Sequence, residues 1–184
     1  MRLFVSLDLP DDLADAVAAA QEPLSDANGL RVTDPTQSHV TLKFLGTVPD
    51  QRLSALTNAL SRAIETTPVE PFTATVGGLG AFPSIDYIRV VWLGVREGAA
   101  EMTALHDAVE SATVELGFSP ESHDFTPHVT IARMEHAGGK ELVQETLRTA
   151  NPTVGEFRVS DVRLTESVLT DDGPVYSTVE RFSL

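Results

Sequence analysis

Two kinds of hydrophobic pattern alternate along the chain. Short runs rich in β-branched and aromatic residues predict strands at residues 2–8, 38–46, 72–76, 87–95, 127–133, 154–159 and 174–182. Between them, apolar residues spaced three and four apart predict helices over about 10–17, 49–65 and 98–116, with a shorter one after 139. The clearest helical series is Leu53, Leu56, Leu60 and Ile64.

The order of these elements repeats once. Arg2 precedes His39 by 37 residues, and Arg89 precedes His128 by 39. At a constant offset of 85, three apolar positions of the first half match three of the second. These pairs are Val69 with Val154, Phe72 with Phe157, and Leu79 with Leu164. We therefore expect a single bilobal domain over residues 1–184, with a pseudo-two-fold axis and repeat halves of approximately 1–83 and 84–184.

Each half carries the same pattern, His-x-Thr-x, within a predicted strand. The two copies start at His39 and His128, with Thr41 and Thr130 two residues later. Because strand side chains alternate between faces, each His shares a face with its Thr, and the apolar neighbours face the core. A pseudo-two-fold axis would turn the two polar faces toward one groove.

Two imidazoles and two hydroxyls at one spot suit phosphodiester cleavage. One neutral His can take a proton from water, while the other, protonated, gives a proton to the leaving oxygen. Both forms are available because imidazoles titrate near neutral pH. The hydroxyls can donate to the charged phosphoryl oxygens. A single His-x-Thr strand is more often structural, but the repetition favours function. The near-symmetric sequence does not decide which His is the acid.

The two motifs and their flanks resemble the signatures of the two-histidine (2H) phosphoesterase superfamily. The resemblance runs over nearly the whole chain and is strongest to the RNA 2′,3′-cyclic phosphodiesterase, or 2′-5′ RNA ligase-like, family. It implies a bilobal α+β fold with two antiparallel sheets flanking a central groove and helices outside. It also implies hydrolysis of a terminal 2′,3′-cyclic phosphate to a 2′-phosphomonoester, with no metal and no cofactor.

The resemblance further implies a role for each motif residue. His39 would be the proton donor to the departing 3′ oxygen, and His128 the proton acceptor that activates water. Thr41 and Thr130 would bind the phosphate. The partners would be RNA 3′ ends or nucleotides that bear a 2′,3′-cyclic phosphate.

Two neighbours extend this site. Arg133 lies five residues after His128 and Phe44 five after His39. A guanidinium can pair with phosphate oxygens, and an aromatic ring can stack on an unpaired base. Strict alternation puts both on the opposite face from their His, so each role requires a bulge or a strand end in between. We also expect His106 on the surface and Trp92 in the core.

The charge balance of the chain bears on its binding partner and on its source. Acidic residues number 27 against 13 Lys and Arg, for a net charge of −14, and the chain has no Cys. Such a balance normally argues against nucleic-acid binding. An acidic, Lys-poor surface also suits very high salt, so we interpret the source as halophilic. The absence of a long apolar segment favours a cytoplasmic protein without membrane attachment, and we expect a monomer.

Two other activities remain open. The reverse reaction, 2′-5′ RNA ligase activity on tRNA halves, uses the same chemistry. A non-catalytic RNA-end binding module would use the motifs to hold phosphate only. Turnover in the presence of a chelator separates an enzyme of this kind from both a binding module and a metallohydrolase.

Overall fold

The computed structural model describes all residues, 1–184. It contains four α-helices and a sheet of nine strands. The helices are α1 (Ala14–Gln21), α2 (Asp50–Thr66), α3 (Ala99–Glu115) and α4 (Lys140–Thr149). The strands are β1 (Arg2–Asp8), β2 (Leu30–Val32), β3 (His39–Thr47), β4 (Phe72–Pro83), β5 (Ile88–Glu97), β6 (His128–Met134), β7 (Thr153–Val159), β8 (Asp161–Thr170) and β9 (Gly173–Ser183).

Every predicted strand and helix is present, and the α+β class is confirmed. The differences lie in strands that were missed or cut short: β2 and β8 were not predicted, and β4 runs beyond residue 76 to Pro83. The second part of β4 contains Gly77, Gly78 and Gly80, a residue type that is depleted in strands. Gly78 has φ 75°, and the pairing with β5 shifts there, so this strand is irregular as well as glycine-rich.

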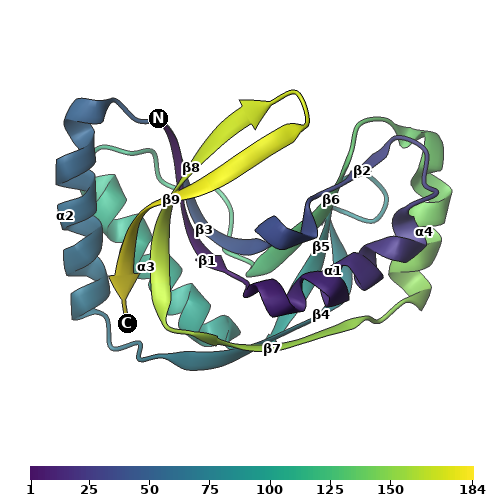
Figure 1. Ribbon diagram of the computed structural model, residues 1–184, viewed down its shortest axis with the longest axis horizontal. Coiled ribbons are helices and arrows are strands. Elements are labelled where there is room, and N and C mark those ends of the chain that lie inside the picture. Colours follow the sequence, from purple (N-terminus) through teal and green to yellow (C-terminus); the bar gives the residue numbers. More distant parts are fainter.

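The strands form two antiparallel groups that meet at a narrow junction. In one lobe the order is β3-β1-β8-β9, and in the other β7-β4-β5-β6, with β2 on the free edge of β6. Helices α2 and α3 accompany the first lobe and α1 and α4 the second (Figure 1). The lobes are joined where β3 pairs with β6 through one residue pair, Val40 and Val129. The two expected sheets are therefore continuous at this point.

The lobes do not coincide with the two sequence halves. Strand β4 of the first half pairs with β5 and β7 of the second, while β8 of the second half pairs with β1. The repeated positions nevertheless occupy matching places. Leu79 lies opposite Leu93 in β5, and Leu164 lies opposite Val5 in β1. Exchange of strands between the halves ties the lobes into one body.

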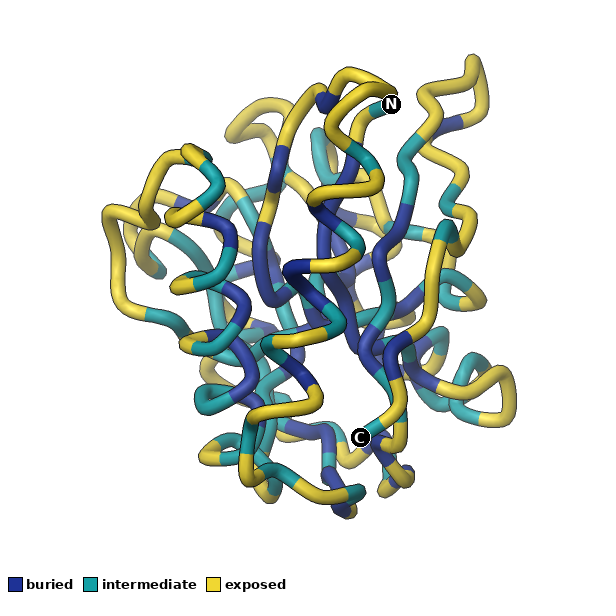
Figure 2. Tube along the Cα trace, turned by 90° about the vertical axis from the view of Figure 1, so that its left-hand side faces the viewer, coloured by how far each residue is buried: buried dark blue, intermediate teal, exposed yellow.

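The hydrophobic core passes through the junction without a break. The inner residues of strands and helices form one buried cluster (Figure 2), and Val40 and Val129 are fully buried in it. Helix α2 contributes Leu56, Leu60 and Ile64 from its predicted apolar face. None of the helices is long and apolar enough to cross a membrane.

One charged side chain is enclosed beside this core. Lys43 on β3 is 2% exposed, and its ammonium pairs with Glu110 of α3 and donates to the Ser119 carbonyl at 2.8 Å. The other Glu110 oxygen accepts from the Glu121 backbone N–H at 2.8 Å. The pair thus connects the first motif strand to the loop that leads into the second motif strand.

This pair generates a stability prediction. Because Lys43 is buried and Glu110 is partly exposed, removing the carboxylate leaves a charge that water cannot reach. We expect Glu110→Ala to lower the free energy of unfolding by about 3–5 kcal/mol. Lys43→Met should cost clearly less, since the remaining carboxylate can be hydrated. Urea unfolding of both variants tests this, and equal losses would contradict the asymmetry.

Candidate active site

The two His-x-Thr-x motifs lie side by side at the junction of the lobes. Val40 and Val129 face each other across β3 and β6 and point into the core. Antiparallel pairing about this point places His39 beside Thr130 and Thr41 beside His128. All four polar side chains are half-buried and occupy the opposite face from the two valines. The expected convergence of both motifs on one face is therefore present in the fold.

The two imidazoles are held in the same way. The Nδ1 atom of His39 lies 2.8 Å from the Gln37 carbonyl, and that of His128 lies 2.6 Å from the Thr126 carbonyl. A carbonyl only accepts, so Nδ1 must carry the hydrogen in both rings. The Nε2 atom of each neutral ring is left with its lone pair available. Either ring can then accept a proton at Nε2, and the protonated ring can donate one from the same atom.

Each motif ends in a β-bulge at its last residue. Between β1 and β3, Ser6 pairs with Thr41 and Val5 with Lys43, so Leu42 is an extra residue. Between β5 and β6, Trp92 pairs with Thr130 and Val91 with Ala132, so Ile131 is the extra residue. Two consecutive side chains in each strand are consequently buried: Leu42 with Lys43, and Ile131 with Ala132.

Because of these bulges, Phe44 and Arg133 lie on the face of the sheet that carries the two histidines, which we call the motif face. Each bulge changes the alternation by one residue, so the side chain five positions after the His returns to the His side. Both residues are exposed, Phe44 at 64%. The geometric condition that the sequence set for their roles is therefore met at both positions.

A helix side chain binds the backbone at each bulge. His106 of α3 contacts the Leu42 carbonyl through Nδ1 at 2.8 Å, and Gln21 of α1 donates to the Ile131 carbonyl at 3.0 Å. The expectation that His106 is a surface residue is wrong: it is 7% exposed and its ring stacks on Phe125. The donors sit 85 residues apart, the repeat offset found in the sequence.

Aromatic rings surround both imidazoles. Phe4 and Tyr176 lie with their ring centroids 5.0 and 5.0 Å from that of His39. Phe82 and Trp92 lie 4.9 and 5.9 Å from that of His128. Sequence reasoning did not identify Phe4, Tyr176 or Phe82, because they are far from the motifs in the sequence and come beside them only in the folded chain.

Trp92 takes a different place from the one expected. It is half-buried, lies outside the core cluster and packs beside His128, with no hydrogen-bond partner for its indole N–H. Gly80 makes room for it, since a Cβ there would come within 2.3 Å of the indole ring. The indole therefore forms part of the wall of the site next to His128.

The electrostatic surroundings of the two imidazoles differ. Burial lowers the pKa of His39, while the Gln37 carbonyl and the Asp8 carboxylate raise it and the Arg133 charge lowers it; the net direction is downward. Burial also lowers the pKa of His128, the Thr126 carbonyl raises it, and the charges of Arg133 and His39 lower it further. Only His39 has a carboxylate that favours its protonated form.

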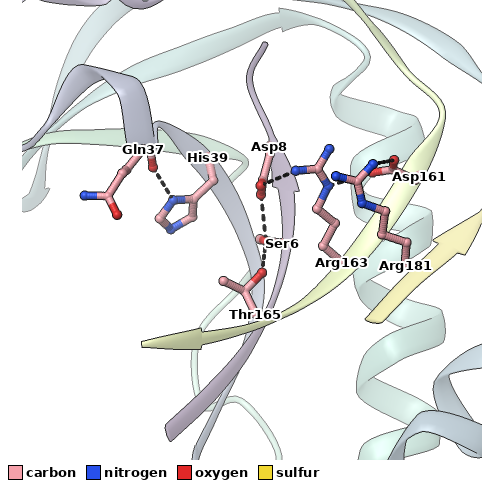
Figure 3. Close-up of polar contacts among 8 residues, drawn as sticks. All are labelled: Ser6, Asp8, Gln37, His39, Asp161, Arg163, Thr165 and Arg181. Atoms are coloured by element: carbon pink, nitrogen blue, oxygen red, sulfur yellow. Dashed lines mark hydrogen bonds and ion pairs between the residues drawn. The ribbon is translucent and has the colours of Figure 1, made fainter. Parts of the chain in front are cut away.

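That carboxylate is firmly placed (Figure 3). Asp8 is the strand partner of His39, pairs with Arg163 at 2.7 Å and accepts from the Ser6 hydroxyl at 2.9 Å. The Ser6 hydroxyl also lies 3.0 Å from that of Thr165. A small cavity of about 130 Å³ opens here and is lined by residues that include Phe4, Asp8, Gln37, His39 and Tyr176.

No group of three or more His, Cys, Asp or Glu side chains is placed to hold a metal ion.

Residues 9–170 match the sequence profile of the 2′-5′ RNA ligase superfamily. The chain belongs to this superfamily. The family that the motifs resemble is therefore confirmed.

Similar members of the superfamily come from archaea and bacteria. The RNA 2′,3′-cyclic phosphodiesterase of Methanothermobacter thermautotrophicus is 36% identical over 100% of this chain and 99% of its own length. That of Archaeoglobus fulgidus is 35% identical, over 99% of both chains. The crystal structure of the protein TT0787 of Thermus thermophilus superposes with a TM-score of 0.83 at 29% identity, covering 100% of this chain and 98% of that one.

Proposed function

We propose that this protein hydrolyses the terminal 2′,3′-cyclic phosphodiester of RNA to a 2′-phosphomonoester by two-histidine acid–base catalysis. The observation that carries the proposal is the placement of His39 and His128 on one face of paired strands, each with Nδ1 bound to a carbonyl and Nε2 left for proton transfer. The relatives named RNA 2′,3′-cyclic phosphodiesterase, which match over the whole chain, support the substrate class.

The surroundings of the two rings support a division of roles. Burial lowers the pKa of both rings, but His39 alone has a carboxylate, that of Asp8, which opposes this, and we therefore assign His39 as the acid. His128 has Arg133 and His39 as charged neighbours and no carboxylate, so it stays neutral and is the base. Water then attacks phosphorus as its proton passes to Nε2 of His128. The bond to the ribose 3′ oxygen breaks, and Nε2 of His39 protonates that oxygen.

The remaining site residues bind the substrate. Thr41 and Thr130 lie beside the imidazoles, and their hydroxyls donate hydrogen bonds to the non-bridging phosphoryl oxygens. Arg133 neutralises the charge that gathers on these oxygens, in keeping with its electrostatic effect on both histidines. Phe44 stacks on the terminal base from the motif face of β3. None of these groups requires a metal ion.

The proposal extends to where the protein works and in what salt concentration. We place the protein in the cytoplasm as a monomer, and we relate its net charge of −14 to a high-salt interior. Molar salt screens self-repulsion between carboxylates and also weakens long-range attraction of RNA. Recognition must then depend on short-range contacts such as those of the threonines and Arg133.

Removal of either imidazole tests the function. We expect His39→Ala and His128→Ala each to lower kcat on a nucleoside 2′,3′-cyclic phosphate by about 10²–10⁴-fold, because each removes one proton-transfer group. The assay contains EDTA and high salt. His136→Ala, at an exposed position two residues after β6, is the control. Near-normal rates in either motif variant would refute the pairing, and tight binding by the wild type without turnover would indicate a binding module.

The division of roles makes a separate pH prediction. Asp8→Asn keeps the shape of the side chain but removes the charge that raises the pKa of His39. If His39 is the acid, its easier deprotonation moves the basic limb of the kcat/KM profile to lower pH. Asp161→Asn is the matched control, since Asp161 also pairs with Arg163 at 3.1 Å. A shift of the acidic limb alone would assign His39 as the base.

A further inference from the structure

Two arginines lie directly opposite each other next to the active site. Arg31 of β2 is the strand partner of Arg133 of β6. Both β2 and β3 border the same edge of β6, β3 at Val129 and β2 from Ala132 onward. Like charges at directly opposed strand positions destabilise a sheet. The placement therefore has a cost that some other interaction must offset.

No protein carboxylate supplies that interaction. The chain has 27 acidic residues against 13 basic ones, yet neither guanidinium lies within 4.0 Å of a carboxylate. The polar contact of Arg31 is a hydrogen bond of 3.3 Å from Nη2 to the Asp172 carbonyl, at the tip of the hairpin formed by β8 and β9. Only Arg163 and Arg181 of the chain's arginines pair with a carboxylate. Arg31 and Arg133 are set apart because they face each other, and anions from outside the chain would offset their repulsion.

The two arginines differ in their distance from the chemistry. Arg133 is on the motif strand β6, and its charge acts on both His39 and His128, whereas Arg31 is on the adjoining strand β2. Arg31 instead reaches the hairpin of the other lobe through its hydrogen bond to the Asp172 carbonyl. A phosphate held by Arg31 is therefore a different one from the phosphate that faces the imidazoles.

We propose that Arg31 binds the phosphodiester on the 5′ side of the terminal nucleotide, so that the preferred substrate is an RNA chain and not a free cyclic mononucleotide. This inference rests on the proposed function, which puts the cyclic phosphate between the histidines beside Arg133. Arg31 then binds the next phosphate along the chain. Its planar guanidinium keeps donors free for phosphate oxygens beyond the one that contacts Asp172.

The test compares two substrates that differ in the upstream phosphate. One is adenosine 2′,3′-cyclic phosphate, which lacks it, and the other is a trinucleotide that ends in the same cyclic phosphate. Arg31→Gln should lower kcat/KM for the trinucleotide about tenfold, equivalent to about 1.4 kcal/mol, and leave the mononucleotide unchanged. The slope of log kcat/KM against log salt concentration should fall by about 0.7 for the trinucleotide.

Arg89→Gln is the matched control. It removes the same charge from an exposed position on the neighbouring strand β5, where the guanidinium lies over the Tyr87 ring, and it should leave both substrates unaffected. Equal losses on both substrates in Arg31→Gln would show that Arg31 acts at the terminal nucleotide or on the fold. No loss on either substrate would show that it binds no phosphate. Either result overturns the inference.

Binding measurements separate this inference from the proposed function. If the wild type turns over neither substrate, the proposed function fails, but the affinities for adenosine 2′-phosphate and for a trinucleotide ending in a 2′-phosphate still decide the role of Arg31. Calorimetric titration should show weaker binding of the trinucleotide alone to Arg31→Gln. An unchanged affinity for it would contradict the upstream site.

Discussion

Buried backbone carbonyls need hydrogen-bond donors, and the centre of this molecule depends on how that requirement is met at two β-bulges. The carbonyls of Leu42 and Ile131 are satisfied by side chains from α3 and α1, His106 and Gln21. Each helix thus fixes an irregular point in a strand that would otherwise favour regular alternation. The bulges in turn decide which face receives Phe44 and Arg133, so the composition of the active site follows from two hydrogen bonds outside it.

The scaffold is nearly symmetric, but the chemistry requires two different imidazoles. The difference comes from the strands beside the motifs. His39 lies opposite Asp8, whereas His128 lies opposite Gly94. The hydroxyls of Ser6 and Thr165 meet next to His39, while the indole of Trp92 lies beside His128. Aromatic rings thus flank both imidazoles of the duplicated unit, but the surroundings of His39 also include a carboxylate and two hydroxyls.

Much of this could be predicted from the sequence, because strand periodicity and an internal repeat are local or additive signals. The motif strands, α2 and α3 and the sharing of a face by both histidines follow from them. The bulges were not predictable by alternation alone, since a buried Lys43 looks like an exposed position until Glu110 is placed beside it. The aromatic neighbours and the exchange of strands between lobes depend on long-range pairing, which no local pattern reports. Strand β4 was cut short in the prediction because its glycines weaken the strand signal.

The central claim is that both imidazoles and Arg133 act on the oxygens bound to one phosphorus atom. A crystal structure with a nucleoside vanadate, a mimic of five-coordinate phosphorus, measures this directly. We expect Nε2 of His39 and Nε2 of His128 at about 2.7–3.2 Å from oxygens on opposite sides of a single vanadium, with Arg133 bound to an equatorial oxygen. A vanadate held by one imidazole only, or an Arg133 turned to the core side of the sheet, would contradict the account.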